Sequence, residues 1–245
     1  MKKDIIIIGG GPAGLSLAIS LANTNLNIII IEKQTLKELA FAPYDGREIA
    51  LTHFSKKILK DLGIWNRIPA DKISPIKEAK VLDGNSPYAL HFDHRKIQKK
   101  ELGYLVSNHL IRRALYKEII TKPNIKIISN ASVVNVSTND VCASVTLSSK
   151  KKIQAPLIVA ADSRNSQIRK IMGISAKIED FRRVAIVCRM KHMKPHKNIA
   201  YECFNYGETL AVLPLAKNVS SIILTIPNAK STKMMNINKN EFNSY

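Results

Sequence analysis

The sequence predicts an α/β fold in which a parallel sheet is followed by an antiparallel sheet. Three observations lead to this prediction. A strand, a glycine-rich turn, an apolar helix and a second strand follow one another over residues 4–32. An amphipathic helix lies among short strand-like runs in the middle of the chain. Apolar and polar residues alternate over residues 181–226, which is typical of antiparallel strands.

The first elements form a complete strand, turn, helix and strand unit. Ile5 to Ile8 is β-branched and apolar throughout, which suits a strand buried on both faces of a parallel sheet. The motif Gly9-x-Gly11-x-x-Gly14 follows and leads into an apolar helix over residues 15–22. A second apolar strand, Leu26 to Ile31, ends at Glu32.

Each feature of this unit has a purpose in binding a dinucleotide. Gly9 permits the tight turn, Gly11 lets the backbone approach a diphosphate, and Gly14 lets the helix pack closely on the strand. The helix N-terminus offers N–H groups to the phosphates, and Pro12 costs no helical hydrogen bond there. The Glu32 carboxylate can accept hydrogen bonds from the ribose hydroxyls and disfavours a 2′-phosphate, so the site suits FAD or NAD rather than NADP. A glycine turn that simply joins strand to helix is the alternative interpretation.

The middle of the chain is predicted to combine helices with short strands. Residues 33–46 are expected to form a polar loop, and a helix is expected from Thr52 to Leu62. Two short strands are predicted at residues 79–82 and 88–92, on either side of a turn. Apolar residues recur at helical spacing from Val106 to Ile120, which predicts an amphipathic helix.

Further strands are predicted towards the C-terminus. Lys150 to Lys152 are expected to form a solvated hairpin tip. Asp162 and Ser163 follow an apolar strand and precede a short helix that Gly173 ends. The predicted strands cover residues 125–128, 131–136, 141–147, 157–160, 184–190, 200–204, 209–213 and 221–226.

Charge and cysteine usage limit the classes of protein. The chain has 38 Lys and Arg against 19 Asp and Glu, and its net charge of +19 raises the question of a polyanionic partner. Its lysines are scattered and only 6% of its residues are aromatic, so we expect no nucleic-acid partner. Its three cysteines are far apart, which favours a reducing, cytoplasmic setting. No apolar run approaches the roughly 18 residues of a membrane helix, so membrane association would be peripheral.

Two pairs of histidines lie at short spacing, but neither is predicted to bind a metal. His91 and His94 surround a strand, where a separation of three residues places side chains on opposite faces. His192 and His196 are interrupted by Pro195, which is incompatible with a helical pair of metal ligands. We therefore predict no metal site.

Four segments of the chain are familiar in combination. They are residues 5–14 with Glu32, residues 45–51 (Asp-Gly-Arg-Glu-Ile-Ala-Leu), residues 102–115 and residues 161–169. In this order they resemble the flavin-dependent aromatic hydroxylases of ubiquinone biosynthesis, which belong to the para-hydroxybenzoate hydroxylase superfamily. The resemblance implies FAD as the cofactor and a Rossmann-like FAD-binding domain of that type, plus a partial antiparallel substrate-domain sheet. It places the FAD-binding domain at residues 1–180, with residues 76–100 contributing strands to the substrate domain, and the partial substrate-binding sheet at residues 181–245.

The resemblance also implies roles for individual residues. The three glycines would cradle the FAD diphosphate, and Glu32 would hold the adenosine ribose. Arg47 would add a cation near the diphosphate, Asn108 and Arg112 would lie along the cofactor, and Asp162 would meet its ribityl and phosphate region. Ordinary surface or turn positions remain the alternative for these last four residues. The predicted cofactor-binding set is Gly9, Gly11, Pro12, Ala13, Gly14, Glu32, Arg47, Asn108, Arg112 and Asp162, with no catalytic side chain.

The chain departs from the family's pattern in two places. Ser163 stands where the family usually has Gly after the acid, which requires a turn that keeps φ negative. Together with the sequence of residues 45–52, this serine resembles the branch of ubiquinone hydroxylases with broad regiospecificity that is found in certain proteobacteria. The family's later Gly-Asp segment has no counterpart, because the chain contains no Gly-Asp dipeptide. We therefore expect a C-terminally truncated member that lacks the last FAD segment.

The resemblance implies an oxidoreductase, a flavoprotein monooxygenase. In this family reduced FAD delivers one oxygen atom of dioxygen to an electron-rich ring, while the protein orients the ring and excludes water. The implied substrate is a polyprenylated phenol or quinol in the membrane, and the implied location is cytoplasmic. Peripheral contact with the inner membrane through lysines, and with members of a ubiquinone-biosynthesis complex, remains open. Two alternatives also remain, namely an inactive remnant and a non-catalytic FAD-binding subunit.

Overall fold

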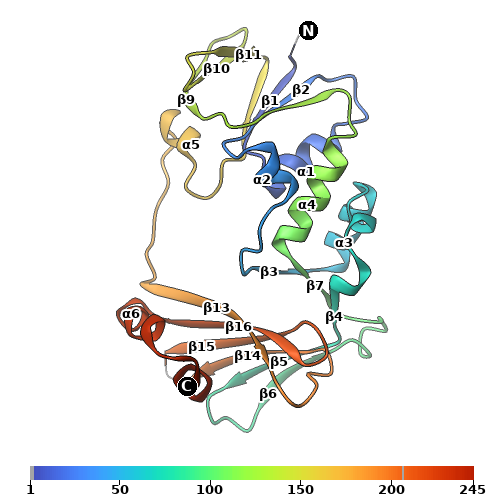
Figure 1. Ribbon diagram of the computed structural model, residues 1–245, viewed down its shortest axis with the longest axis vertical. Helices are drawn as coiled ribbons and strands as arrows, with labels where there is room; N and C mark the ends of the chain where they lie inside the picture. Colours follow the sequence, from blue (N-terminus) through green and yellow to red (C-terminus); the bar gives the residue numbers. More distant parts are fainter. Residues whose placement is uncertain (1–2, 206) are drawn as a thin grey trace. The chain divides into compact units, whose positions relative to one another are not determined.

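The computed structural model describes residues 3–205 and 207–245, and the chain divides into two compact units (Figure 1). The first unit consists of the residues up to Asp45 together with residues 56–69 and 108–177. The second unit consists of residues 46–55, 70–107 and 178–245. Each unit is therefore assembled from three separate stretches of sequence.

The first unit is built on a four-stranded parallel sheet. Its strands, in spatial order, are β12 (Leu157–Ala160), β1 (Ile5–Ile8), β2 (Ile28–Ile31) and β8 (Ile125–Ile128). Every residue of β1 and β2 is buried. A strand covered on both faces needs apolar side chains at every position, which explains why these two strands consist of isoleucine alone.

Layers on both faces of the parallel sheet bury it. Ile6 and Ile8 pack with Val145 and Ile153 of a three-stranded antiparallel sheet. On the other side, Ile7 lies next to Gly14, and the helix that carries this glycine contacts a second helix. The elements that cover the sheet are β9 (Val133–Thr138), β10 (Ala143–Leu147), β11 (Lys152–Ala155), α1 (Pro12–Ser20) and α4 (Asn108–Ile119). The predicted strand, turn, helix and strand unit is confirmed.

Short helices complete the first unit, and one of them replaces a predicted loop. These are α2 (Leu36–Ala40), η1 (Trp65–Arg67) and α5 (Gln167–Ile171). Residues 33–46 were expected to be irregular, but α2 begins there with a capping box. The Thr35 hydroxyl accepts a hydrogen bond from the Glu38 N–H (3.2 Å), and the Glu38 carboxylate accepts one from the Thr35 N–H (2.7 Å). Because two N-terminal donors are satisfied by a four-residue pattern, this helix could have been read from the sequence.

The second unit contains a six-stranded sheet. Its strands, in spatial order, are β13 (Arg183–Lys191), β16 (Val219–Pro227), β15 (Glu208–Pro214), β14 (Ile199–Asn205), β5 (Glu78–Asp83) and β6 (Ala89–Asp93). The predicted antiparallel pairing is found everywhere except between β14 and β5, which run parallel. The buried residues Leu224 and Ile226 pack with Met234 and Phe242 of two C-terminal helices, α6 (Asn228–Asn236) and α7 (Lys239–Ser244).

A small sheet completes the second unit. The sheet has the order β3 (Glu48–Leu51), β7 (Gly103–Ser107) and β4 (Ile73–Ile76), and η2 (Ala70–Lys72) precedes β4. The helix α3 (His53–Asp61) follows β3; its first three residues belong to the second unit and the others to the first. The helix predicted from Val106 begins only at Asn108, because residues 103–107 form the central strand of this sheet. None of the helices in the described part of the chain has both the length and the hydropathy needed to span a bilayer.

A buried carboxylate joins this small sheet to the large one within the second unit. The Glu48 side chain is only 1% exposed. It accepts hydrogen bonds from the Ser107 hydroxyl (2.8 Å) and from the Arg189 guanidinium (2.5 Å). Because these three side chains form hydrogen bonds with one another, they fix the positions of β3, β7 and β13 relative to one another.

A second buried carboxylate supports α4 in the first unit. Glu118 lies 2.5 Å from the Arg67 guanidinium and 2.6 Å from the Lys122 ammonium group. Burial opposes ionisation of this carboxyl group, but Lys122 and Arg67 together hold its pKa below the ordinary value. The folded protein is therefore expected to keep Glu118 charged.

Replacing this carboxylate is expected to destabilise the first unit in a pH-dependent way. Glu118→Gln should lower the free energy of unfolding at neutral pH by about 2 kcal/mol, because two cations lose their partner and both are partly exposed. A group whose folded pKa is depressed stabilises the protein above its unfolded pKa and ceases to do so as pH falls through the folded pKa. Urea unfolding of both proteins from neutral to acid pH should therefore show the difference shrinking in acid. Asp61→Asn, at an exposed carboxylate, is the control, and a difference independent of pH would contradict the expectation.

Candidate functional site

The turn after β1 depends on two glycines. Gly9 has a φ of +112°, and a Cβ atom there would lie 2.4 Å from the Ala161 carbonyl oxygen at the end of β12. A Cβ atom at Gly14 would lie 2.0 Å from the Gly9 carbonyl oxygen. Both distances are far inside van der Waals contact, so the backbones of β12 and α1 approach this turn only because side chains are missing.

The third glycine of the motif lies in a different environment. Gly11 is the N-cap of α1, its φ of −77° is an ordinary one, and a Cβ atom there would meet nothing within 4 Å. Pro12 and Ala13 form the exposed first turn of the helix. The first N–H groups of a helix have no intrahelical acceptor and favour an anion. This open position can therefore accept a negatively charged group.

Glu32 lies beside the same turn, at the end of β2. The residue is 7% exposed. Its carboxylate accepts hydrogen bonds from the backbone N–H of Gly10 (2.5 Å) and of Gln34 (2.8 Å). Two backbone donors thus hold the carboxylate in a fixed orientation next to the glycine turn.

Two predicted residues of α4 bind the segment that follows β2. Arg112 donates a hydrogen bond to the Gln34 side-chain oxygen (2.5 Å), two positions after Glu32. The Asn108 amide donates one to the Asp45 carboxylate (2.7 Å). Sequence reasoning missed Gln34, whose position two residues after the predicted ribose-binding acid was the available signal.

Asp162 follows β12, next to Gly9. One of its carboxylate oxygens accepts a hydrogen bond from the Ile168 N–H (3.1 Å). The other oxygen, Oδ1, is buried and has no hydrogen-bond partner in the part of the chain that the structure describes. A buried acceptor without a donor is costly, and an external hydroxyl or N–H group would satisfy it.

Ser163 contradicts one expectation. The turn was expected to keep φ negative there, but Ser163 has a φ of +89°. This is a conformation that glycine adopts freely and that costs other residues of the order of 1 kcal/mol or more. The serine therefore occupies a backbone conformation that favours glycine.

Restoring glycine at this position is expected to stabilise the first unit. Ser163→Gly should raise the free energy of unfolding by about 1 kcal/mol, because relief of the positive φ outweighs the larger entropy of the unfolded chain. Thermal and urea unfolding measure the change. Ser163→Ala keeps the Cβ atom and should give no gain, so a similar gain from alanine would show that backbone strain is not the cause.

The structure brings most of the predicted residues into one unit. The glycine turn, Glu32, Asn108, Arg112 and Asp162 all belong to the first unit. Arg47 is exposed and belongs to the second unit. Its role beside the diphosphate stays a prediction.

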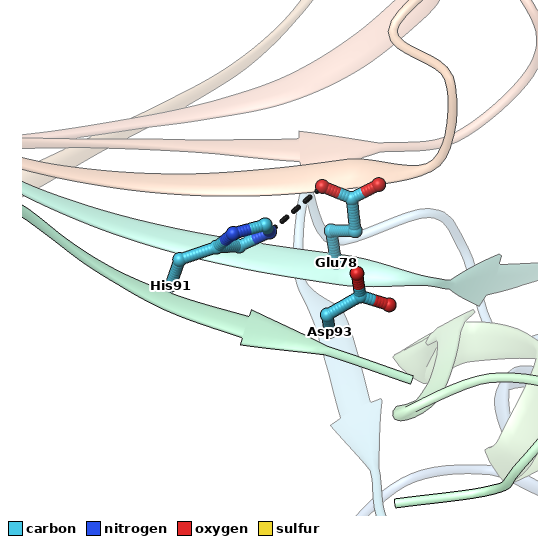
Figure 2. A group of neighbouring side chains, drawn as sticks. All are labelled: Glu78, His91 and Asp93. Atoms are coloured by element: carbon cyan, nitrogen blue, oxygen red, sulfur yellow. Dashed lines mark hydrogen bonds and ion pairs between the residues drawn. The ribbon is translucent and has the colours of Figure 1, made fainter. Parts of the chain in front are cut away.

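One group of side chains in the second unit has the composition of a metal site. Glu78, His91 and Asp93 converge from β5 and β6, with ligand atoms within 4.8 Å of one another, and Figure 2 shows the hydrogen bond between His91 and Glu78 (2.8 Å). However, the Arg95 guanidinium already binds the Asp93 carboxylate (2.5 Å) and holds its pKa well below the ordinary value. We propose no metal there, because a cation would have to displace this arginine. His94 does not join the group but bonds to the Lys99 carbonyl.

A cavity of about 310 Å³ lies in the second unit, whereas the glycine turn belongs to the first. It is lined mainly by apolar side chains of the six-stranded sheet and of α7, including Met190, Leu210, Ile222, Leu224 and Phe242. None of the ten residues predicted to bind the cofactor contributes to this lining.

Proteins of similar sequence include two that are named as ubiquinone hydroxylases. The ubiquinone hydroxylase UbiM of Neisseria meningitidis is 44% identical over 245 residues, which cover 98% of this chain and 53% of that protein. UbiL of Rhodospirillum rubrum is 32% identical over 222 residues, covering 91% of this chain and 51% of that protein. The chain spans about half the length of these curated relatives.

Solved structures show the same fold at low sequence identity. PqsL of Pseudomonas aeruginosa, described as a probable FAD-dependent monooxygenase, matches with a TM-score of 0.78 at 13% identity, over 96% of this chain and 63% of that one. The p-nitrophenol 4-monooxygenase PnpA of Pseudomonas putida matches with a TM-score of 0.77 at 13% identity, over 99% and 60%. The predicted fold class is confirmed.

The match to a protein family covers nearly the whole chain. The family described as "FAD binding domain" matches residues 2–241. The predictions of the family relationship and of FAD as the cofactor are thereby confirmed. This chain belongs to the FAD binding domain family.

Proposed function

We propose that this chain provides the FAD-binding unit and a substrate-binding sheet of a monooxygenase that hydroxylates a polyprenylated phenol or quinol in ubiquinone biosynthesis. The observation that carries the proposal is the 44% identity to a ubiquinone hydroxylase over 98% of the chain. In this proposal the first unit binds FAD and the second unit binds the aromatic substrate. The protein would work in the cytoplasm, at the inner membrane and beside other proteins of the pathway.

The residues of the glycine turn fit the cofactor. The open space at Gly11 gives a diphosphate access to the N-terminus of α1, while Gly9 and Gly14 shape the turn that creates this space. Glu32 is already oriented by two N–H groups and retains acceptor capacity for ribose hydroxyls. Pro12 and Ala13, in the first turn of α1, would lie beside the phosphates.

Polar residues elsewhere in the chain extend this assignment. The unsatisfied Oδ1 of Asp162 would accept a hydrogen bond from a ribityl hydroxyl. Arg112 and Asn108 would lie along the cofactor from α4, each oriented by the hydrogen bond it already makes. Arg47 would supply a further positive charge for the diphosphate.

Reduced FAD, when bound, supplies two electrons to dioxygen. One oxygen atom is then transferred to the ring and the other is released as water. The chain's own residues would bind the aromatic substrate and orient it. In the six-stranded sheet, Glu202 lies opposite Val81 and Ala211, and burial raises its pKa. A partly buried acid with apolar neighbours on both adjacent strands suits an apolar ring that carries a phenolic hydroxyl.

Flavin binding and oxygen insertion can be tested separately. The purified chain would be titrated with FAD, and the flavin bound after gel filtration would be measured by absorbance. Chemically reduced holoprotein would then be mixed with oxygen and a short-chain prenylated phenol, and the product analysed by mass spectrometry. We expect stoichiometric flavin and the gain of one oxygen atom. Flavin without oxygen insertion would indicate a non-catalytic FAD-binding subunit, and absence of flavin would indicate an inactive remnant.

A further inference from the structure

Exposed apolar side chains gather with lysines along one short stretch of the second unit. We call residues 88–100 the edge segment; it contains β6, the last strand of the six-stranded sheet, and the turn that follows (Figure 1). Four large apolar residues of this segment are about half exposed or more: Tyr88 (84%), Leu90 (60%), Phe92 (49%) and Ile97 (52%). Apolar side chains gathered at this density on a surface usually mark a binding site.

The two faces of β6 differ sharply in character. His91 and Asp93 point to one face, as does Glu78, which bonds to His91 (Figure 2). Arg95 binds the Asp93 carboxylate. Leu90 and Phe92 alternate with them and therefore point to the opposite face. The polar side of the strand is thus already paired, and the apolar side is left exposed.

The turn after β6 is held in one conformation. The N–H groups of Lys96 and Lys99 donate to the carbonyls of Asp93 and His94, both at 3.1 Å. The His94 ring also bonds to the Lys99 carbonyl (2.8 Å). Ile97 is therefore exposed on a turn that is ordered before any partner binds, which reduces the entropic cost of binding.

The charge of this turn is available to a partner. Arg95 is neutralised by Asp93, but Lys96, Lys99 and Lys100 are exposed and make no side-chain hydrogen bond or ion pair with the residues that the structure describes. Three ammonium groups on the same turn as the exposed Ile97 match an anionic lipid surface. Phosphates and other anionic headgroups pair with the lysines, while the apolar and aromatic side chains enter the interfacial layer.

We propose that the edge segment binds the surface of an anionic lipid bilayer, with Lys96, Lys99 and Lys100 on the headgroups and Ile97 inserted between them. The proposal extends the proposed function, since a polyprenylated substrate resides in a bilayer, and it rests on that function for its purpose. The edge segment is defined by its exposed side chains, whatever the function of the chain. It can therefore be tested without flavin or turnover.

The test is sedimentation of the 245-residue chain with phospholipid vesicles. Vesicles of phosphatidylcholine alone are compared with vesicles that contain about one-third phosphatidylglycerol. We expect binding only to the anionic vesicles, and its loss at high salt. The triple variant Lys96→Gln, Lys99→Gln, Lys100→Gln should bind on the order of 100-fold more weakly, because each lysine near the surface contributes about fivefold. Ile97→Ser should weaken binding several-fold without changing the charge.

A second triple variant controls for net charge. Lys150→Gln, Lys151→Gln, Lys152→Gln removes the same number of charges from the exposed hairpin tip, where Ser148 and Ser149 precede the lysines and Ile153, which follows them, is buried. It should bind anionic vesicles nearly as well as the unaltered chain. Equal losses in both triple variants would overturn the proposal in favour of net charge alone.

Other outcomes would also overturn it. Equal binding to neutral and anionic vesicles would exclude the role of the lysines. Light scattering without lipid would detect self-association, and a dimer lost in Ile97→Ser would assign the edge of β6 to a second copy of the chain. Circular dichroism and thermal unfolding of each variant separate a local effect from misfolding. A chain that binds vesicles but fails to hydroxylate would disprove only the proposed function.

Discussion

Gly11→Glu is expected to abolish FAD binding while leaving the fold intact. A Cβ atom added at this position would meet nothing within 4 Å, and the φ of Gly11 is one that any residue adopts. The new carboxylate would occupy the space in front of α1 that the diphosphate needs. Repulsion between these like charges at about 4 Å should weaken binding on the order of 1,000-fold at an intermediate effective dielectric constant.

The measurement is an FAD titration followed by circular dichroism and thermal unfolding of the apoprotein. Gly11→Ala is the matched control, since it adds a small uncharged group and should bind FAD far better than the glutamate variant. Unaltered FAD affinity in Gly11→Glu, with normal unfolding, would show that the diphosphate does not lie at this turn. Loss of folding would instead show that the open space is needed by the protein itself.

Gly9→Ala is expected to unfold the first unit. Alanine at a φ of +112° is strained, and its Cβ atom would lie 2.4 Å from the Ala161 carbonyl, which belongs to rigid backbone. Strain and overlap together should cost about 4 kcal/mol, a large part of the stability of a domain. Chemical unfolding should show a much lower midpoint, and bound FAD should be lost with the fold.

A glycine elsewhere in the first unit separates strain from overlap. Gly173 also has a positive φ, +68°, but a Cβ atom there meets nothing within 4 Å. Gly173→Ala should therefore cost only about 1 kcal/mol. If both alanine variants lost the same stability, close approach of β12 to the glycine turn would not be what requires Gly9.

The part of the fold that could be predicted from sequence is the part specified locally. Ile5 to Ile8, the three glycines and Glu32 all lie within the first 32 residues, in the order that a strand, glycine turn, helix and strand unit requires. The helix α4 could also be predicted from local sequence, because its apolar residues recur at helical spacing. The overlooked α2 was equally local, because its capping box spans only four residues.

What could not be predicted depends on residues far apart in sequence. The parallel pairing of β5 with β14 joins positions more than a hundred residues apart, and no local pattern encodes it. Residues 103–107 form a strand because β3 and β4 pair with them, so the periodicity of the following helix could not show where that helix begins. The positive φ of Ser163 is likewise imposed by its surroundings, against the preference of the residue.

The composition of each unit from three separate stretches has a consequence for biogenesis. β1 is among the first segments to leave the ribosome, but its neighbour β12 is synthesised about 150 residues later. β5 and β6 likewise precede the other four strands of their sheet. Neither core can close during early translation, and such distant pairings slow folding and expose apolar strands to aggregation. The nascent protein should therefore depend on chaperones until β12 and β16 have been made.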